Sequence, residues 1–388
     1  MTPDATETAG APSCLTLAPY SFSGRGPAQS CAQIAQAMVA AGLRTRVVAG
    51  RVRSPLGQGV ETRAPWAPVV RRLPWGRVEP AALRLWEAAA RAELSSADPR
   101  TTVVHVWPGT PATLVREAND RGFVTVREMI NSALATSGPI LDAAYARLGL
   151  PPTHTVTAQG IADETLELAL YDYVFASNPE VERSLQAVGI PSAQILTTTF
   201  GWSPDRFADP GPVVRDVPFR AVFVGRIGVR KGVPELLDAW ADAAVDGELL
   251  LVGEVDPEIA SLVQAATRSG TVRLAGYVER PAAAFAASDV FVFPTHEEGG
   301  PQVTYEAAGC GLPVITTPMG AARLIVDDVN GFIVDPGSSD QLAASIMRVA
   351  GDPLGRRRWA AAARSGAAEF VYEAVGARRA LMLRALLS

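Results

Sequence analysis

The chain has 388 residues, more than one ordinary hydrophobic core contains, so two domains are expected. Its net charge of −5 gives no indication of a nucleic-acid partner, and its polar first ten residues lack the pattern of a signal peptide. No apolar run approaches the roughly twenty residues of a membrane-spanning helix, and the three cysteines are isolated, which argues against a disulfide framework or a thiolate zinc site. We therefore expect a cytoplasmic protein.

Short apolar runs alternate with helical patterns along the whole chain. Continuous β-branched runs with helices between them are typical of parallel sheets that are covered on both faces. The runs fall into two series, which predicts two doubly wound α/β domains joined in the Pro-, Gly- and Asp-rich stretch 201–218. Helices are predicted at 30–43 and 162–171, among others. The predicted strands are 14–19, 45–50, 102–107, 123–129, 173–177 and 195–200 in the first series, and 220–226, 248–254, 271–277, 290–295 and 313–318 in the second.

The turn after the first strand of the second series contains two cations. Gly225 ends the strand, and Arg226 and Lys231 follow before a helix that is expected to begin near Pro234. Ligands of open α/β sheets bind beyond the carboxyl ends of the strands. An Arg and a Lys beside a helix N-terminus are well suited to hold a diphosphate. The alternative is a solvated loop with surface cations.

Two glutamates, Glu298 and Glu306, lie on either side of a glycine-rich turn and the start of a helix. Glycines let a backbone approach a ligand closely, and a proline suits the first turn of a helix. Glu306 is expected one turn into the helix, where it can accept hydrogen bonds from vicinal hydroxyls, whereas Glu298 would face whatever extends beyond a bound anion. A diphosphate between a sugar and a ribose fits this layout, and the alternative is an ordinary helix with Glu306 facing solvent. The groups expected to face the ligand between the two acids are Gly299, Gly300, Pro301 and the backbone amides of Gln302 and Val303.

Residues 298–315 resemble the E-x7-E signature of the group 1 glycosyltransferases, a family of retaining, nucleotide-sugar-dependent enzymes with the GT-B fold. The segment 223–232 is similar to the family's strand–Gly-Arg–loop–Lys-Gly motif. This resemblance implies two facing Rossmann-like domains: an acceptor-binding domain over 1–207 and a nucleotide-sugar-binding domain over 208–365, with a C-terminal helix in 366–388 that crosses back onto the first domain. Further segments that resemble the family are 16–48, 173–207, 271–299, 327–346 and 370–387.

The resemblance also implies an activity. The enzyme would move a sugar from a nucleotide-diphosphate sugar to a hydroxyl group of a small-molecule, lipid or glycan acceptor, with retention of the anomeric configuration. The Ala- and Arg-rich composition suggests a bacterial source, and so the biosynthesis of secondary metabolites, glycolipids or envelope glycans. No metal ion or other cofactor is expected, and the sequence contains no Asp-x-Asp pair suited to hold a metal beside the phosphates.

Residue roles can be carried over from the family wherever the motifs match. Arg226 and Lys231 would hold the diphosphate and stabilise the leaving nucleotide. Glu298 would lie against the donor sugar, Glu306 would bind the ribose hydroxyls, and the base is expected near 276–281. The full set of predicted donor-binding residues is Gly24, Gly26, Gly225, Gly299, Gly300, Pro301, Gln302, Val303, Glu306, Tyr277 and Val278.

The sequence departs from the family where many relatives carry a histidine near the reacting carbon. The segment 124–138 has Arg127, Glu128 and Asn131 there, and Glu128 and Asn131 are candidate contacts of the acceptor. His105, at the end of the preceding strand, is the candidate for the catalytic role of that histidine, with a purely structural role as the alternative. His154 is a further candidate for the acceptor cleft.

Proteins of similar fold also have other functions, and two of these are alternatives here. A nicotinamide dehydrogenase is disfavoured because Gln29 stands where the third glycine of the G-x-G-x-x-G pattern is required in 24–29. A phosphorylase-like enzyme, or an inactive homologue that acts as a partner subunit, has the same fold and is kept as the alternative. The segment 51–80, rich in Arg, Trp and Pro, is interpreted as a loop over the acceptor site in preference to a peripheral membrane contact.

Overall fold

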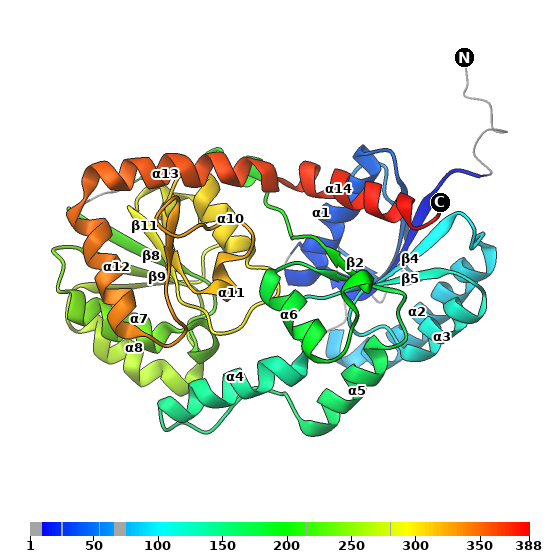
Figure 1. The fold of residues 1–388 in the computed structure, drawn as a ribbon, viewed down its shortest axis with the longest axis horizontal. Coiled ribbons are helices and arrows are strands. Elements are labelled where there is room, and N and C mark those ends of the chain that lie inside the picture. Colours follow the sequence, from blue (N-terminus) through cyan, green and yellow to red (C-terminus); the bar gives the residue numbers. More distant parts are fainter. Residues whose placement is uncertain (1–9, 25, 54, 66–74, 214–215, 280) are drawn as a thin grey trace, which may run out of the picture.

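A computed structural model describes residues 10–24, 26–53, 55–65, 75–213, 216–279 and 281–388. Within them the chain forms two parallel sheets, each flanked by helices, which lie side by side along the long axis of the molecule (Figure 1). The predicted pair of doubly wound α/β domains is therefore confirmed. The segment 51–80 contains β3 (Glu61–Arg63) and the start of α2 (Trp75–Ser96), while its residues 54 and 66–74 lie outside the described residues. Its position over the acceptor site stays a prediction.

The first sheet has seven strands in the order β3-β2-β1-β4-β5-β6-β7, and all neighbours pair in parallel. Its central strand β4 is buried along its whole length, as a strand covered on both faces must be. The strands are β1 Ser13–Phe22, β2 Arg44–Val52, β3 Glu61–Arg63, β4 Thr102–Val106, β5 Val124–Glu128, β6 Tyr173–Ala176 and β7 Ile195–Thr197. The helices are α1 Gly26–Ala40, α2 Trp75–Ser96, α3 Ala112–Asp120, α4 Leu134–Arg147, α5 Ala158–Leu168 and α6 Pro179–Ala187.

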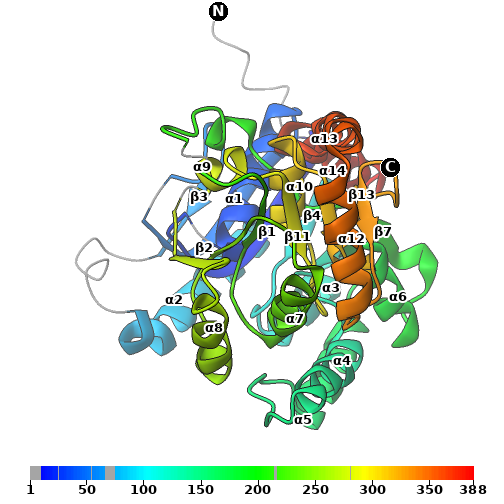
Figure 2. The same cartoon turned by 90° about the vertical axis from the view of Figure 1, so that its left-hand side faces the viewer.

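The second sheet has six strands in the order β10-β9-β8-β11-β12-β13, again all parallel. Figure 2 views the molecule from this side and shows α8 and α12 on either side of β11. The strands are β8 Arg220–Val224, β9 Glu248–Val252, β10 Val272–Gly276, β11 Val290–Phe293, β12 Val314–Thr316 and β13 Gly331–Ile333. The helices are α7 Val233–Ala243, α8 Ala260–Thr267, α9 Ala282–Ala286, α10 Gln302–Gly309, α11 Pro318–Ala321, α12 Ser339–Gly351 and α13 Pro353–Ala367, followed by α14 Tyr372–Ala385.

Two strands were not predicted from the sequence, and two predicted strands are only half as long as expected. The edge strand β3 has the sequence Glu-Thr-Arg and is exposed throughout, so it has no apolar run to detect. The strand β13 is only three residues long. The strand predicted over 313–318 ends at Thr316, because the side chain of Thr317 accepts a hydrogen bond from the amide of Gly320 and caps α11. The strand predicted over 195–200 ends at Thr197.

The C-terminal helix α14 crosses back onto the first domain, as the fold prediction requires (Figure 1). It packs on α1, and the contact is close because a Cβ on Gly376 would collide with Ala37. Its Arg379 is fully buried and forms two bonds to the carboxylate of Glu128 at the end of β5, at 2.6 and 3.0 Å. The last helix thus joins the first domain by packing and by a buried ion pair.

The first domain also extends a helix toward the second. Tyr145, near the end of α4, belongs to the hydrophobic core around the second sheet. Its hydroxyl donates to Glu258 of the second domain at 2.8 Å. The two domains therefore meet on both sides of the space between their sheets.

Candidate active site

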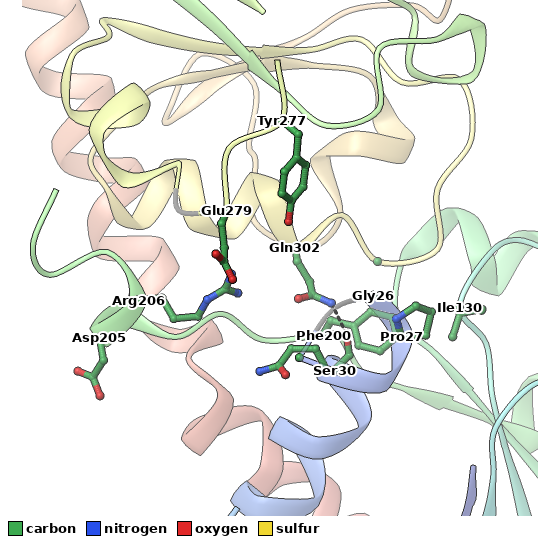
Figure 3. Close-up of a pocket in the computed structure, with 13 residues that line it drawn as sticks. Gly26, Pro27, Ser30, Ile130, Phe200, Asp205, Arg206, Tyr277, Glu279 and Gln302 are labelled. Carbon is green, nitrogen blue, oxygen red and sulfur yellow. Dashed lines mark hydrogen bonds between the residues drawn. The ribbon is translucent and has the colours of Figure 1, made fainter. Parts of the chain in front are cut away.

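A cleft of about 780 Å³ lies between the two domains, beyond the carboxyl ends of their strands. The first domain contributes the loop after β1 and the start of α1, and the second domain contributes the turn after β10 and the start of α10. Figure 3 shows these side chains pointing into the cleft from both domains. Of the predicted donor-binding residues, the cleft is lined by Gly24, Gly26, Tyr277, Gly300 and Gln302. It is further lined by Pro27, Gln29, Ser30, Ile130, Phe200, Asp205, Arg206 and Glu279, which the sequence did not point to.

Gln302 connects three parts of the molecule at the edge of this cleft. Its side-chain amide donates to the hydroxyl of Ser30 on α1 (Figure 3). Its carbonyl oxygen accepts from the hydroxyl of Tyr372 on α14 at 3.0 Å. Its backbone amide donates to the carbonyl of Gly300 at 2.9 Å. The prediction that this backbone amide is free for an anion is therefore wrong for this structure, because the turn itself uses the donor.

The two glycines before α10 make room for the first domain. A Cβ on Gly299 would collide with the backbone carbonyl of Ile130, which follows β5, and a Cβ on Gly300 would collide with the ring of Phe200. The carbonyl of Gly299 also accepts a hydrogen bond from Ser177 Oγ at 2.9 Å. Both glycines make room for the first domain, and Gly300 also lines the cleft, as expected of a glycine that admits a ligand.

Lys231 and Glu298 form an ion pair behind the glycine-rich turn. Lys231 lies in a short 3-10 turn between β8 and α7, and only 12% of its side chain is exposed. The turn approaches the end of β11 closely, because Gly232 has a φ of 67° and a Cβ there would collide with the carbonyl of Pro294. The ammonium group lies 5.6 Å from the centre of the Phe293 ring. Local backbone geometry therefore holds the cation at the carboxyl edge of the sheet.

The surroundings of this pair favour the charged carboxylate of Glu298 and disfavour the charged ammonium of Lys231. Burial acts to raise the pKa of Glu298, but the charges of Lys231 and Arg230 outweigh it and hold that pKa below its ordinary value. Burial lowers the pKa of Lys231, and the attraction of Glu298 counters only part of this effect. Neither residue is among those that line the cleft.

Lys231 is also the only lysine in the whole sequence, which has 35 Lys and Arg residues in total. Arginine serves at every other cationic position of the chain. A compact ammonium on a flexible stem differs from a planar guanidinium in size and in hydrogen-bond geometry. The presence of a lysine at this one position alone is a feature of the composition that points to the site, and it was not used in the predictions from the sequence.

Glu306 lies one turn into α10, as predicted, and 13% of its side chain is exposed. Its carboxylate oxygen is 3.4 Å from a guanidinium nitrogen of Arg206, which belongs to the segment that connects the two domains. Arg206 lines the cleft, so this contact places Glu306 beside it.

Arg226 is not among the residues that line the cleft. Its guanidinium pairs with Asp256 and with Glu254, the latter at 3.1 Å, and 56% of its side chain is exposed. The carbonyl of Gly225 lies close to Gly253, the residue after β9. A Cβ on Gly253 would collide with this carbonyl. The predicted roles of both residues in holding the diphosphate stay predictions. Pro301, Val303 and Val278 flank the site without lining the cleft.

The arginine that lies next to the acids is Arg230, which the sequence analysis did not select. Its side chain contacts Glu297 at 2.8 Å, donates to Asn131 of the first domain at 3.0 Å, and lies 3.8 Å from Glu298. Glu297 is buried and accepts from the backbone amide and the hydroxyl of Ser132, at 3.1 and 2.9 Å. Glu297 therefore links the two domains, and Asn131 takes part in the same link.

His105 and Glu128 are corrections to the sequence analysis. His105 is 1% exposed and Glu128 is fully buried, and neither is among the residues that line the cleft. His105 Nε2 lies 2.8 Å from the Glu128 carboxylate, which Arg379 also binds. Both side chains are buried in the core of the first domain and pair with each other, so they have a structural role in this conformation. The strand-end positions were predicted correctly, but the side chains point into the domain core.

His154 lies apart from the cleft as well. Its Nε2 contacts Asp142 of α4 at 3.0 Å, and its ring packs edge-on against Tyr145. This position is a correction to its prediction as an acceptor contact. Among the described residues there is no group of three or more His, Cys, Asp or Glu side chains arranged to hold a metal ion. None of the described helices combines the length and the apolar character that crossing a membrane requires.

Comparison with known proteins finds a family match within the second domain. Residues 218–352 match the family model described as "Glycosyl transferases group 1". The second domain is a group 1 glycosyltransferase domain. The matched range includes the turn with Lys231, the glycine-rich turn and both glutamates of the E-x7-E signature.

Two curated relatives illustrate how much of the chain the sequence matches cover. The capsular polysaccharide biosynthesis glycosyltransferase CapM of Staphylococcus aureus is 34% identical over 137 residues, which are 34% of this chain and 36% of the relative. A GDP-mannose-dependent alpha-mannosyltransferase of Mycobacterium tuberculosis is 31% identical over 214 residues, 53% of this chain and 52% of the relative. The chain spans between about a third and three fifths of the length of the first curated relatives that it matches.

Solved structures match over almost the entire chain. Sucrose-phosphate synthase from Thermosynechococcus elongatus has a TM-score of 0.75 and 22% identity, with 96% of this chain and 99% of that chain covered. Anabaena Alr3699/HepE, solved in complex with UDP and glucose, has a TM-score of 0.68 and 16% identity, with 96% and 100% covered. At these identities the likeness shows the fold, and the predicted GT-B architecture of the chain is confirmed.

Proposed function

We propose that this chain transfers a sugar from a nucleoside diphosphate sugar to a hydroxyl acceptor, with retention of the anomeric configuration and without a metal ion. The observation that carries the proposal is the cleft itself. Glycines of the first loop face Tyr277, Gly300 and Gln302 across it, and the Lys231–Glu298 pair and Glu306 lie at the same carboxyl edge of the second sheet. This is where open α/β sheets bind ligands.

The chemistry follows from the charges. When the bond between the sugar carbon and the diphosphate oxygen breaks, its electron pair stays on the diphosphate, and the sugar carbon becomes electron-poor. The acceptor oxygen then forms the new bond to that carbon and gives up its proton. An ammonium group has three N–H donors, so Lys231 can keep its contact with Glu298 and still donate to phosphate oxygens. A fixed cation of this kind stabilises the leaving group as its charge develops.

Names of relatives indicate the class of donor and acceptor. One relative is described as GDP-mannose-dependent, one solved structure holds UDP and glucose, and CapM is described as a capsular polysaccharide glycosyltransferase. We propose UDP- or GDP-linked hexoses as donors, and acceptors in bacterial envelope glycan, glycolipid or secondary-metabolite biosynthesis. The cytoplasm is the proposed site of action, in keeping with three free cysteines.

The proposal is tested by incubating the full chain with UDP- and GDP-linked hexoses in excess EDTA and measuring release of the nucleoside diphosphate. Release from one nucleotide class is expected, slow with water and faster with an acceptor from the proposed classes. Proton NMR of the product should show the anomeric configuration of the donor. Release that requires an added divalent ion, or a product of inverted configuration, would overturn the corresponding part of the proposal. Sugar phosphate formed from inorganic phosphate without a nucleotide would favour the phosphorylase-like alternative.

A further inference from the structure

Arg206 occupies an unusual place in this cleft, because it belongs to neither sheet. It ends the short 3-10 turn Pro204–Arg206 in the segment that connects the two domains. Its side chain is 44% exposed and lines the cleft, and Figure 3 shows it extending toward the side where Glu279 and Gln302 lie. One guanidinium nitrogen is 3.4 Å from Glu306 Oε1.

The surroundings of Glu306 contain few groups that can hold it as a carboxylate. Tyr372 of α14 faces it, but burial raises the pKa of that phenol, which stays neutral. Burial raises the pKa of the thiol of Cys310, the residue after α10, to about 12, so this group is neutral too. Arg364 of α13 is engaged 2.9 Å from the carbonyl of Cys310. Within the described part of the chain, Arg206 is therefore the cation that acts on Glu306.

Burial and Arg206 act on Glu306 in opposite directions. Burial raises the pKa of the Glu306 carboxyl, and the positive charge of Arg206 lowers it, with burial the larger effect. A carboxyl group with a raised pKa takes up its proton when the pH falls from neutrality. Without Arg206 the pKa rises further, and the proton is taken up at a higher pH.

We propose that Arg206 is a positioning residue for ribose recognition, which orients the Glu306 side chain and holds it as a carboxylate for the vicinal hydroxyls of the nucleotide. A carboxylate has about four lone-pair sites, so one contact from Arg206 leaves acceptors for two hydroxyl donors. This inference rests on the proposed function, since it concerns the same donor site. It adds that the connecting segment, and not only the second domain, sets the affinity for the ribose.

The test compares ribonucleotides with their 2′-deoxy forms. Dissociation constants for UDP and 2′-deoxy-UDP, and for GDP and 2′-deoxy-GDP, are measured between pH 5 and 8 for the wild-type full chain, Arg206→Gln and Arg206→Lys. The ratio of the two constants isolates the ribose contact, because the phosphates titrate alike in both forms. Arg357→Gln is the control, since Arg357 is an exposed arginine of α13 outside the cleft.

The wild-type protein is expected to prefer the ribonucleotide by about tenfold at pH 8, the effect of one hydrogen bond to a charged group. This preference should disappear as the pH falls. Arg206→Gln should lose it at a higher pH than the wild type, whereas Arg206→Lys and Arg357→Gln should keep the wild-type profile. A wild-type profile in Arg206→Gln, with the preference intact, would overturn the inference alone. If the wild-type protein binds neither UDP nor GDP, the proposed function is contradicted, and the inference about Arg206, which rests on it, is contradicted as well.

Discussion

At the scale of single residues, the contact between His105 and Glu128 shows what burial does to ionisable groups. Burial lowers the pKa of His105, even though Glu128 acts to raise it. The neutral imidazole then donates its Nε2 proton to Glu128, and Nδ1 has no partner within the described residues. The buried carboxylate of Glu128 is balanced by Arg379 instead, whose charge and hydrogen bonds help to hold its pKa below the ordinary value against the effect of burial.

This arrangement predicts a specific pH dependence of stability. The unfolded chain protonates His105 near pH 6.5, whereas the folded chain does so only at a lower pH. Stability due to this residue is therefore fully present above that pH and falls as the pH drops, by up to about 1.4 kcal/mol per pH unit. His105→Gln should flatten the decline of the unfolding free energy between pH 7 and 5, measured by urea titration. An unchanged decline would show that His105 is charged in the folded protein.

At the scale of elements, the ion pair between Arg379 and Glu128 fastens α14 to β5. Both side chains are fully buried, so removing one partner leaves a buried charge without compensation. Arg379→Met is expected to cost about 3–5 kcal/mol of unfolding free energy. The double variant Arg379→Met, Glu128→Gln should recover part of this loss. Arg378→Met is the matched control, because the neighbouring Arg378 is exposed and donates to the carbonyl of Glu369.

The glycine-rich turn before α10 gives a second prediction at this scale. A methyl group at Gly299 would collide with backbone atoms of Ile130, which cannot move without displacing one domain. Gly299→Ala should therefore destabilise the chain by about 1–3 kcal/mol, the range for overpacking. Gly351→Ala is the control, since a Cβ there meets no atom within 4 Å. Equal unfolding free energies for the two variants would mean that the close contact between the turn and the first domain does not persist in solution.

Sequence patterns predicted those parts of the molecule that are determined by residues close together in the sequence. Buried parallel strands such as β4 and β11 give continuous apolar runs, and the turn with Lys231 follows directly from one of them. The contact between Arg206 and Glu306 joins positions 100 residues apart, and no periodicity links them. Likewise, β3 has no apolar side chain, so its place in the sheet comes from pairing with β2 alone.

At the scale of the whole molecule, Glu297 holds the two domains together from its buried position. Its carboxylate bridges Ser132 of the first domain and Arg230 of the second. Hydrogen bonds to charged groups contribute about 1.5–3 kcal/mol each to stability. This single residue therefore has a large effect on the relative position of the two domains. The roles of the two adjacent acids are therefore distinct: Glu297 links the domains, and Glu298 pairs with Lys231 at the proposed donor site.

Glu297→Gln should therefore shift the molecule toward conformations with separated domains. The expected result is a larger radius of gyration in small-angle X-ray scattering, with the helix content unchanged in circular dichroism. Glu254→Gln serves as the control, because Glu254 is exposed and pairs with Arg226 on the surface of the second domain. Scattering curves of Glu297→Gln and the wild type that superimpose would rule out the bridging role.

The central claim is that the cleft binds a nucleoside diphosphate, with Lys231 holding the phosphates. The most direct measurement is a calorimetric titration of the full chain with UDP and GDP in EDTA, for the wild type, Lys231→Met, Lys231→Arg and the surface control Arg91→Met. We predict one-to-one binding of at least one nucleotide, retained in Arg91→Met and weakened at least about tenfold in both Lys231 variants, since a guanidinium does not match the ammonium it replaces. Wild-type affinity in Lys231→Met would contradict the account.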